Sequence, residues 1–202
     1  MSRIVSRKGT KTDAKIAKKN FVPSVLSLCL CVKLIFAPSV SAQNGAIDWP
    51  RYQDMAVDLM QQYLRINTSN PPGNEIEAAR FFKKIFDQNG IQNEIFEYKP
   101  GRANIIARLK GNGSKRPIIL LSHMDVVTAE PASWEVDPFA ATIKNDSIYG
   151  RGALDMKGEG LLHLMTMILL KREGPPLSRD VIFLGTADEE VPEEGSLWMT
   201  PN

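Results

Sequence analysis

PIILLSHMDVV, residues 117–127, joins a continuous apolar run to a histidine and an aspartate. The run from Pro117 to Ser122 predicts the central strand of a sheet, because a strand covered on both faces needs no polar alternation. His123 and Asp125 follow it two residues apart, and at the spacing of a strand their side chains share one face. This stretch therefore predicts a buried strand that ends in groups able to carry chemistry.

Two helices and two strands are predicted before this stretch. Apolar residues recur at helical spacing from Trp49 to Ile66 and from Glu75 to Asn89, and Gly90 stands where a C-terminal cap is expected. The inner face of the second helix is predicted to comprise Ala78, Ala79, Phe82, Ile85 and Phe86. The pattern then alternates over 92–98 and 103–109, which predicts two strands joined by a turn.

After the stretch, residues 142–149 predict a strand or hairpin arm, 161–171 a strongly apolar helix and 181–186 a buried strand. Helices and strands in this order favour an α/β fold. We predict a three-layer sandwich around a mixed, mostly parallel sheet.

The charges of the 202 residues are segregated along the chain. Residues 1–42 hold eight Lys and Arg and one acid, which leaves 17 of the 25 basic and 22 of the 23 acidic residues in 43–202. This acidic body argues against nucleic acid as a partner. No stretch of 18 or more apolar residues occurs beyond the N-terminus, so no integral membrane span is expected there.

The first 42 residues have the layout of a signal peptide: a basic region, an apolar run and small residues ending at Ala42. We expect export to the periplasm or the medium with cleavage before Gln43; an uncleaved membrane anchor is the alternative. The only cysteines, Cys29 and Cys31, lie in this segment. Any metal ligands of the mature chain are then histidine and carboxylate.

Three segments carry candidate chemistry. A metal-binding histidine usually passes its other ring proton to a carboxylate, so His123 and Asp125 can supply a ligand and its orienting group. Asp155 lies in the glycine-rich YGRGALDMKGEG before the apolar helix, either as a functional carboxylate or as the N-cap of that helix. Lys157 is either a solvated first-turn residue or, given its flanking glycines, a point of close approach.

The third segment, VIFLGTADEEV, places Glu189 and Glu190 directly after a predicted strand. They are either ordinary loop carboxylates or a metal ligand beside a general base for a metal-bound water. His163, on an apolar helix, is interpreted as a packed histidine. Trp134 and Phe139 either shape a pocket rim or serve packing.

Taken in order, these segments resemble the dizinc aminoacylase, acetylornithine deacetylase, succinyl-diaminopimelate desuccinylase and glutamate carboxypeptidase family of metallopeptidases. The matching pieces are NPPGNE (70–75), SHMDVV (122–127), SWEVDPF (133–139), YGRGALDMKG (149–158) and TADEE (186–190).

The resemblance implies hydrolysis of an amide bond, in a small peptide near a terminus or in an N-acyl amino acid, at a site with two zinc ions. His123 would bind one zinc, Asp155 would bridge both, and Glu190 would bind the second. Asp125 would orient His123, and Glu189 would be the general base. Oxygen and imidazole ligands also tolerate Co²⁺ or Mn²⁺.

The family also has a further carboxylate ligand, a lid or dimerisation domain and a late histidine ligand, which 43–202 do not show. The resemblance therefore implies an N-terminal portion of the catalytic domain, with weak zinc binding, little activity and no dimerisation by itself. We expect strand edges to be exposed around 181–186 and solubility to be poor.

Two alternatives come from other classes of protein. A non-catalytic binding protein could keep this fold, although the presence of all five site residues favours a hydrolase. A serine hydrolase of α/β type lacks support because no G-x-S-x-G occurs, and the HExxH pattern of zincins is also missing.

Overall fold

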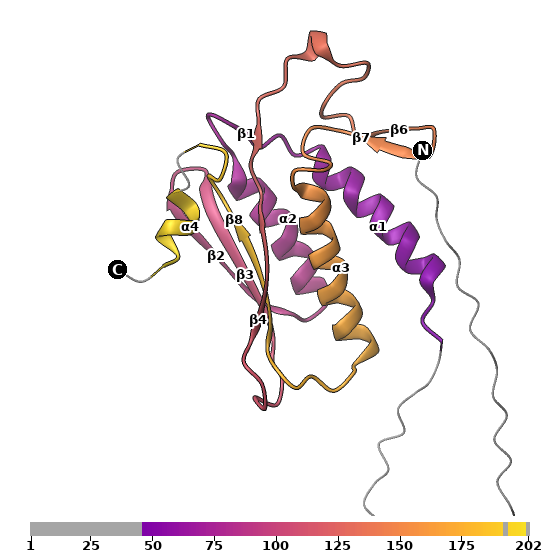
Figure 1. Ribbon diagram of the computed structural model, residues 1–202, viewed down its shortest axis with the longest axis vertical. Helices are drawn as coiled ribbons and strands as arrows, with labels where there is room; N and C mark the ends of the chain where they lie inside the picture. The colour runs from indigo at the N-terminus through magenta and orange to yellow at the C-terminus, as the bar shows by residue number, and fades with distance from the viewer. Residues whose placement is uncertain (1–45, 192–193, 201–202) are drawn as a thin grey trace, which may run out of the picture. The chain divides into compact units, whose positions relative to one another are not determined.

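The computed structural model describes residues 46–191 and 194–200 (Figure 1). The predicted signal peptide and both cysteines lie outside these residues. The elements, in chain order, are α1 (Trp49–Leu64), β1 (Ser69–Asn70), α2 (Glu75–Gln88), β2 (Gln92–Lys99), β3 (Arg102–Leu109), β4 (Ile118–His123), β5 (Val126–Val127), the 3₁₀ helix η1 (Pro131–Ser133), β6 (Thr142–Lys144), β7 (Ser147–Tyr149), α3 (Lys157–Glu173), β8 (Val181–Thr186) and α4 (Glu194–Trp198).

The main sheet has the strand order β2-β3-β8-β4, and it is mixed as predicted. The expectation of a mostly parallel sheet is wrong, since within this sheet β3 runs antiparallel to β2 and β8 and only β4 and β8 are parallel. β1 and β5 form a separate parallel pair. A tight turn joins β2 to β3 at Gly101, so these strands must be antiparallel, whereas α3 supplies the long crossover that a parallel pair needs.

The prediction that 117–122 form the central strand is also wrong. β4 lies at the edge of the four-stranded sheet, and Ile119 and Leu121 on its outer face are 55% and 49% exposed. The strand at 181–186 is itself paired on both sides as β8, so the exposed strand edge expected around it lies instead on its neighbour β4. A continuous apolar run predicts a strand, but it does not indicate which strands pair with it.

One face of the sheet is covered by α2 and α3, and α1 packs against α3 (Figure 1). Phe82 and Phe86 of α2 pack on Phe183 of β8, with ring centroids 4.9 and 5.2 Å apart. All five residues predicted for the inner face of α2 are buried. This layer confirms the helical periodicity seen in the sequence.

The opposite face carries only α4 among the described residues, and the Trp198 ring packs on Phe96 and Tyr98 of β2. The described part of the chain thus has two layers with a short third element, which is part of the truncated three-layer sandwich that was predicted. None of its helices is long and apolar enough to cross a bilayer.

The prediction of a strand or hairpin arm over 142–149 is confirmed. β6 and β7 pair antiparallel around Asn145 and Asp146, which have φ angles of 51° and 56°. Asn and Asp tolerate this left-handed conformation better than other residues with a Cβ, which makes them suitable for a two-residue hairpin turn.

Candidate metal centre

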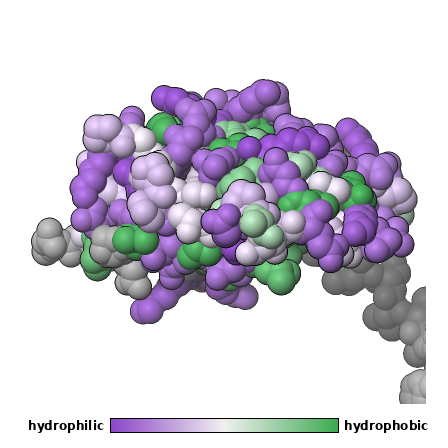
Figure 2. All heavy atoms as spheres, turned by 90° about the horizontal axis from the view of Figure 1, so that it is seen from above, coloured by the Kyte–Doolittle hydropathy of each residue, from purple (hydrophilic) through white to green (hydrophobic). Residues whose placement is uncertain are grey.

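The predicted chemical groups meet at one end of the sheet. His123, the last residue of β4, pairs with Thr186, the last residue of the parallel strand β8. Asp125 follows the first strand, and Glu189 and Glu190 follow the second. The carboxyl ends of neighbouring strands are the usual ligand site of an open α/β sheet. Figure 2 views the molecule from this end, where polar side chains cover most of the surface.

The His123 ring is buried and presents its two nitrogens to different partners. Nδ1 lies 3.0 Å from the backbone oxygen of Asp125 and 3.5 Å from its Oδ1. Nε2 lies 3.1 Å from Asp155 Oδ1 and 3.8 Å from Glu189 Oε2. Burial alone would lower the pKa of His123, but the Asp125 and Glu189 carboxylates outweigh it and raise the pKa to about 9.

Asp125 is fully buried and holds several groups at once. Its carboxylate accepts hydrogen bonds from Asn70 Nδ2 at 2.8 Å and from the backbone N–H groups of Glu189 and Glu190 at 3.1 and 3.0 Å. Burial would raise the pKa of Asp125, but its contact with His123 and these hydrogen bonds outweigh it and lower the pKa to about 2. Asp125 therefore joins the histidine to the paired glutamates.

His123, Glu189 and Glu190 each offer a ligand atom, and these atoms all lie within 4.8 Å of one another. An imidazole with carboxylates is a donor set that fits Zn²⁺. Asp155, whose side chain is 81% exposed, faces the same histidine nitrogen. The alternative that Asp155 caps α3 is wrong, because the N-cap residue is Met156.

Lys157 anchors the turn that carries Asp155. Its side chain is fully buried, and Nζ donates to the backbone oxygens of Ile66 at 2.5 Å and Tyr63 at 3.3 Å. Burial lowers the pKa of Lys157 to about 7. A Cβ added at Gly152 would lie 3.3 Å from this side chain. The interpretation as a solvated lysine is therefore wrong, and that of close approach is confirmed.

A buried polar network behind the site was not predicted. Arg102 forms ion pairs with Asp188 and with Glu75, the latter at 3.1 Å between Nε and Oε2. Arg102 also donates to Asn70 Oδ1 at 3.1 Å. Gly73, at φ +77°, makes room, since a Cβ there would lie 1.8 Å from Arg102 Nη1. The NPPGNE segment thus serves this network; Arg102 itself has no recognisable signal in the sequence.

Glu75 makes the stability of the chain depend on pH. Burial raises the pKa of Glu75 to about 7, despite the nearby Arg102, and the negative charge of Asp125 adds to the rise. The folded chain thus holds this proton more tightly than the unfolded chain, so stability is lost as the pH rises. We expect the unfolding free energy to fall by about 2–3 kcal/mol between roughly pH 5 and pH 8 through this group alone.

Urea denaturation of the wild type and of Glu75→Gln across this pH range measures the contribution of Glu75. Glu75→Gln should have a shallower dependence on pH, whereas Glu77→Gln, on the exposed side of the same helix, should keep that of the wild type. If the unfolding free energies of Glu75→Gln and Glu77→Gln depend equally on pH, the pH dependence does not come from Glu75.

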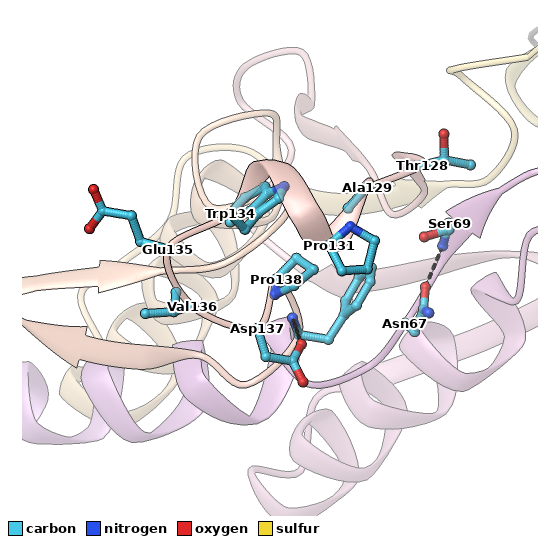
Figure 3. A pocket seen from close by; sticks show the side chains of 11 residues that line it. Asn67, Ser69, Thr128, Ala129, Pro131, Trp134, Glu135, Val136, Asp137 and Pro138 are labelled. Atoms are coloured by element: carbon cyan, nitrogen blue, oxygen red, sulfur yellow. Dashed lines mark hydrogen bonds between the residues drawn. The ribbon is translucent and has the colours of Figure 1, made fainter.

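A cavity of about 700 Å³ lies beside the loop that follows β5 (Figure 3). It is lined by Asn67, Ser69, Thr128, Ala129, Pro131, Trp134, Glu135, Val136, Asp137, Pro138 and Phe139. The Glu135 carboxylate points away from the rings in Figure 3 and pairs with Lys144 at 3.0 Å. Trp134 also lines a second cavity of about 300 Å³ that includes Asp155. Both predicted aromatic residues therefore line a pocket.

His163, the other histidine of the chain, lies apart from this cluster on α3. Its side chain is largely buried, with Nε2 3.7 Å from Glu159 Oε1. The interpretation as a packed histidine is confirmed.

Comparisons with known proteins indicate the family of this chain. Residues 119–202 match the profile of peptidase family M20/M25/M40. A Staphylococcus aureus protein named as a probable succinyl-diaminopimelate desuccinylase is 39% identical over 142 residues, which are 69% of this chain and 34% of that protein. The chain thus spans about a third of the length of the curated relatives that it matches.

Two solved structures have a similar fold. An M20 family metallo-carboxypeptidase from Sulfolobus solfataricus superposes with a TM-score of 0.60 at 27% identity, over 67% of this chain and 31% of that one. Human carnosine dipeptidase 1 shares the fold, with a TM-score of 0.61 at 22% identity over 72% of this chain and 34% of that one.

Proposed function

The chain belongs to the M20/M25/M40 peptidase family, over part of its catalytic domain, and we propose that it supplies metal ligands and the general base of a two-zinc hydrolase of amide bonds. The observation that carries the proposal is the convergence of His123, Glu189 and Glu190 within 4.8 Å, with Asp155 facing His123. With Glu189 as the base, His123, Asp155 and Glu190 supply three ligands, the number that a catalytic zinc ion usually takes from the protein.

The residues divide the chemistry between them. Zinc, when bound, would polarise the substrate carbonyl and acidify a water. His123, Asp155 and Glu190 would hold the metal, and Asp125 fixes the His123 ring. Glu189 would take the proton of the attacking water and return it to the leaving amine. Because Asp125 also accepts the backbone N–H groups of both glutamates, ligand and base are held by one carboxylate.

Small peptides or N-acyl amino acids are the proposed substrates. The names of the relatives, a desuccinylase and a metallo-carboxypeptidase, support both classes. We place the side chain or acyl group of the substrate in the cavity beside Trp134, because Trp134 also lines the cavity that includes Asp155. Six of the eleven lining residues are apolar, counting the two prolines, which favours an apolar group.

Zinc titration of the purified chain tests the function. Ligand that binds only the folded state stabilises it by about 2.7 kcal/mol at a concentration 100 times the Kd, so zinc should raise the unfolding free energy by roughly this amount. Calcium, which prefers more oxygen ligands, is the control. No stabilisation by Zn²⁺, Co²⁺ or Mn²⁺ would refute the metal site. Hydrolysis of either substrate class by the zinc-loaded chain would exclude the non-catalytic alternative.

Export remains part of the proposal, on the basis of residues 1–42. The mass of the chain decides between the two: a chain beginning at Gln43 in the periplasm or the medium indicates a cleaved signal, and a chain beginning at Met1 in the membrane fraction indicates an anchor.

A further inference from the structure

We propose that Asp188 is a positioning residue: a buried clamp of Asn70, Glu75 and Arg102 holds it in a left-handed conformation and thereby directs the paired glutamates towards His123. The inference rests on the proposed function, because it assigns Asp188 a part in building the same site. Asp188 itself contacts no reacting atom and acts through the backbone that follows it.

The backbone of Asp188 is the first observation. Its φ angle is +65°, in the left-handed region that residues with a Cβ rarely adopt. The residue follows β8 by two positions and is only 6% exposed. Strained conformations of this kind persist where the surroundings hold them, and they cluster at functional sites. The chain therefore turns at Asp188, immediately before Glu189 and Glu190.

The surroundings hold Asp188 from four elements. Oδ1 accepts from Asn70 Nδ2 at 2.9 Å and forms the ion pair with Arg102, while Oδ2 accepts from the Tyr98 hydroxyl at 3.3 Å. The backbone N–H donates to Glu75 Oε1 at 3.3 Å. These partners come from β1, β2, β3 and α2, so both the side chain and the backbone of Asp188 are fixed by the tertiary structure.

The clamp is joined directly to the metal-binding groups. Asn70 Nδ2 bridges Asp188 Oδ1 and Asp125 Oδ2, at 2.9 and 2.8 Å. Asp125 in turn accepts the backbone N–H groups of Glu189 and Glu190. The two glutamates thus leave a fixed turn and are tied at their backbone to Asp125, which leaves their carboxylates directed at His123.

Two other roles for Asp188 fit the contacts less well. As a metal ligand it would need a free oxygen, but its carboxylate is buried and engaged by Asn70, Arg102 and Tyr98. As a purely structural ion pair it would affect the whole fold equally. A positioning role instead predicts a local effect on Glu189 and Glu190.

Amide hydrogen exchange and zinc affinity of the full chain test this. In Asp188→Ala the N–H groups of Glu189 and Glu190 should exchange at least ~10-fold faster than in the wild type, while that of Phe183 in β8 changes far less. The same variant should weaken zinc binding about 10–100-fold, the range for partners that orient ligands. Asp188→Asn should lose less zinc affinity, because Asn keeps the shape of the side chain and tolerates the left-handed backbone.

Asp180→Ala is the matched control. Asp180 precedes β8 as Asp188 follows it, and it pairs with Arg108 of β3 as Asp188 pairs with Arg102. It should change neither the exchange at Glu189 and Glu190 nor the zinc affinity. Should Asp188→Ala not fold, Asp188→Gly takes its place, because it removes the same side-chain contacts without backbone strain.

Wild-type exchange at Glu189 and Glu190 in the Asp188 variant would overturn the inference, as would an equal acceleration throughout β8. If the wild-type chain binds no zinc, the proposed function fails, and the exchange rates still decide the role of Asp188.

Discussion

His123→Ala should weaken zinc binding on the order of 100-fold or more, because loss of an outer partner of a ligand already costs about 10–100-fold. Nε2 of this ring faces both Asp155 and Glu189 and, among the residues that the structure describes, is the only nitrogen in the candidate metal-binding cluster. The remaining carboxylates are oxygen donors, which select less strongly for zinc over magnesium or calcium. Isothermal titration of the purified chain with Zn²⁺ measures the effect.

The matched control is His163→Ala. The chain has two histidines, and His163 is packed on α3 against Glu159, outside the cluster. Its removal should leave the zinc affinity within about threefold of the wild type, the scatter expected for a site that makes no shared contacts. Comparable losses in the two variants would show that zinc binds elsewhere or without specificity.

The longer helices and strands could be predicted from local patterns to within four residues, whereas the short elements β1, β5, η1 and α4 were not predicted. The helical spacing of Phe82, Ile85 and Phe86 identified the buried face of α2, because periodicity reflects which side of an element is covered. The place of β4 could not be predicted in this way. Its apolar residues record burial on one face by α3, whereas the outer residues Ile119 and Leu121 are exposed at a sheet edge.

The candidate site could be predicted as far as its motifs are local. His123, Asp155 and the pair Glu189 and Glu190 each stand beside an element that sequence patterns locate, and the structure brings them together. The network behind them joins residues 70, 75, 102 and 188, which no short pattern connects. Such long-range contacts depend on the pairing of β3 with β8 and on the turn before α2.

Arg102→Met should lower the unfolding free energy by about 3–5 kcal/mol, since removing one partner of a buried ion pair leaves the other charge uncompensated. The Asp188 carboxylate depends on this guanidinium, and so does that of Glu75 in the fraction of molecules in which it is ionised. Methionine fills much of the same space, so the loss reports charge and hydrogen bonding rather than a cavity. Urea denaturation at pH 7 is the measurement.

Arg108→Met provides the comparison on the same strand. Arg108 also pairs with an aspartate, Asp180, but its side chain is 46% exposed. Exposed ion pairs contribute about 0–1 kcal/mol, so this variant should stay close to the wild type. If Arg102→Met and Arg108→Met lower the unfolding free energy equally, the network around Arg102 does not depend on charge compensation. A further combination with Glu75→Gln and Asp188→Asn should recover part of the loss in Arg102→Met, because it removes the charges that Arg102 compensates.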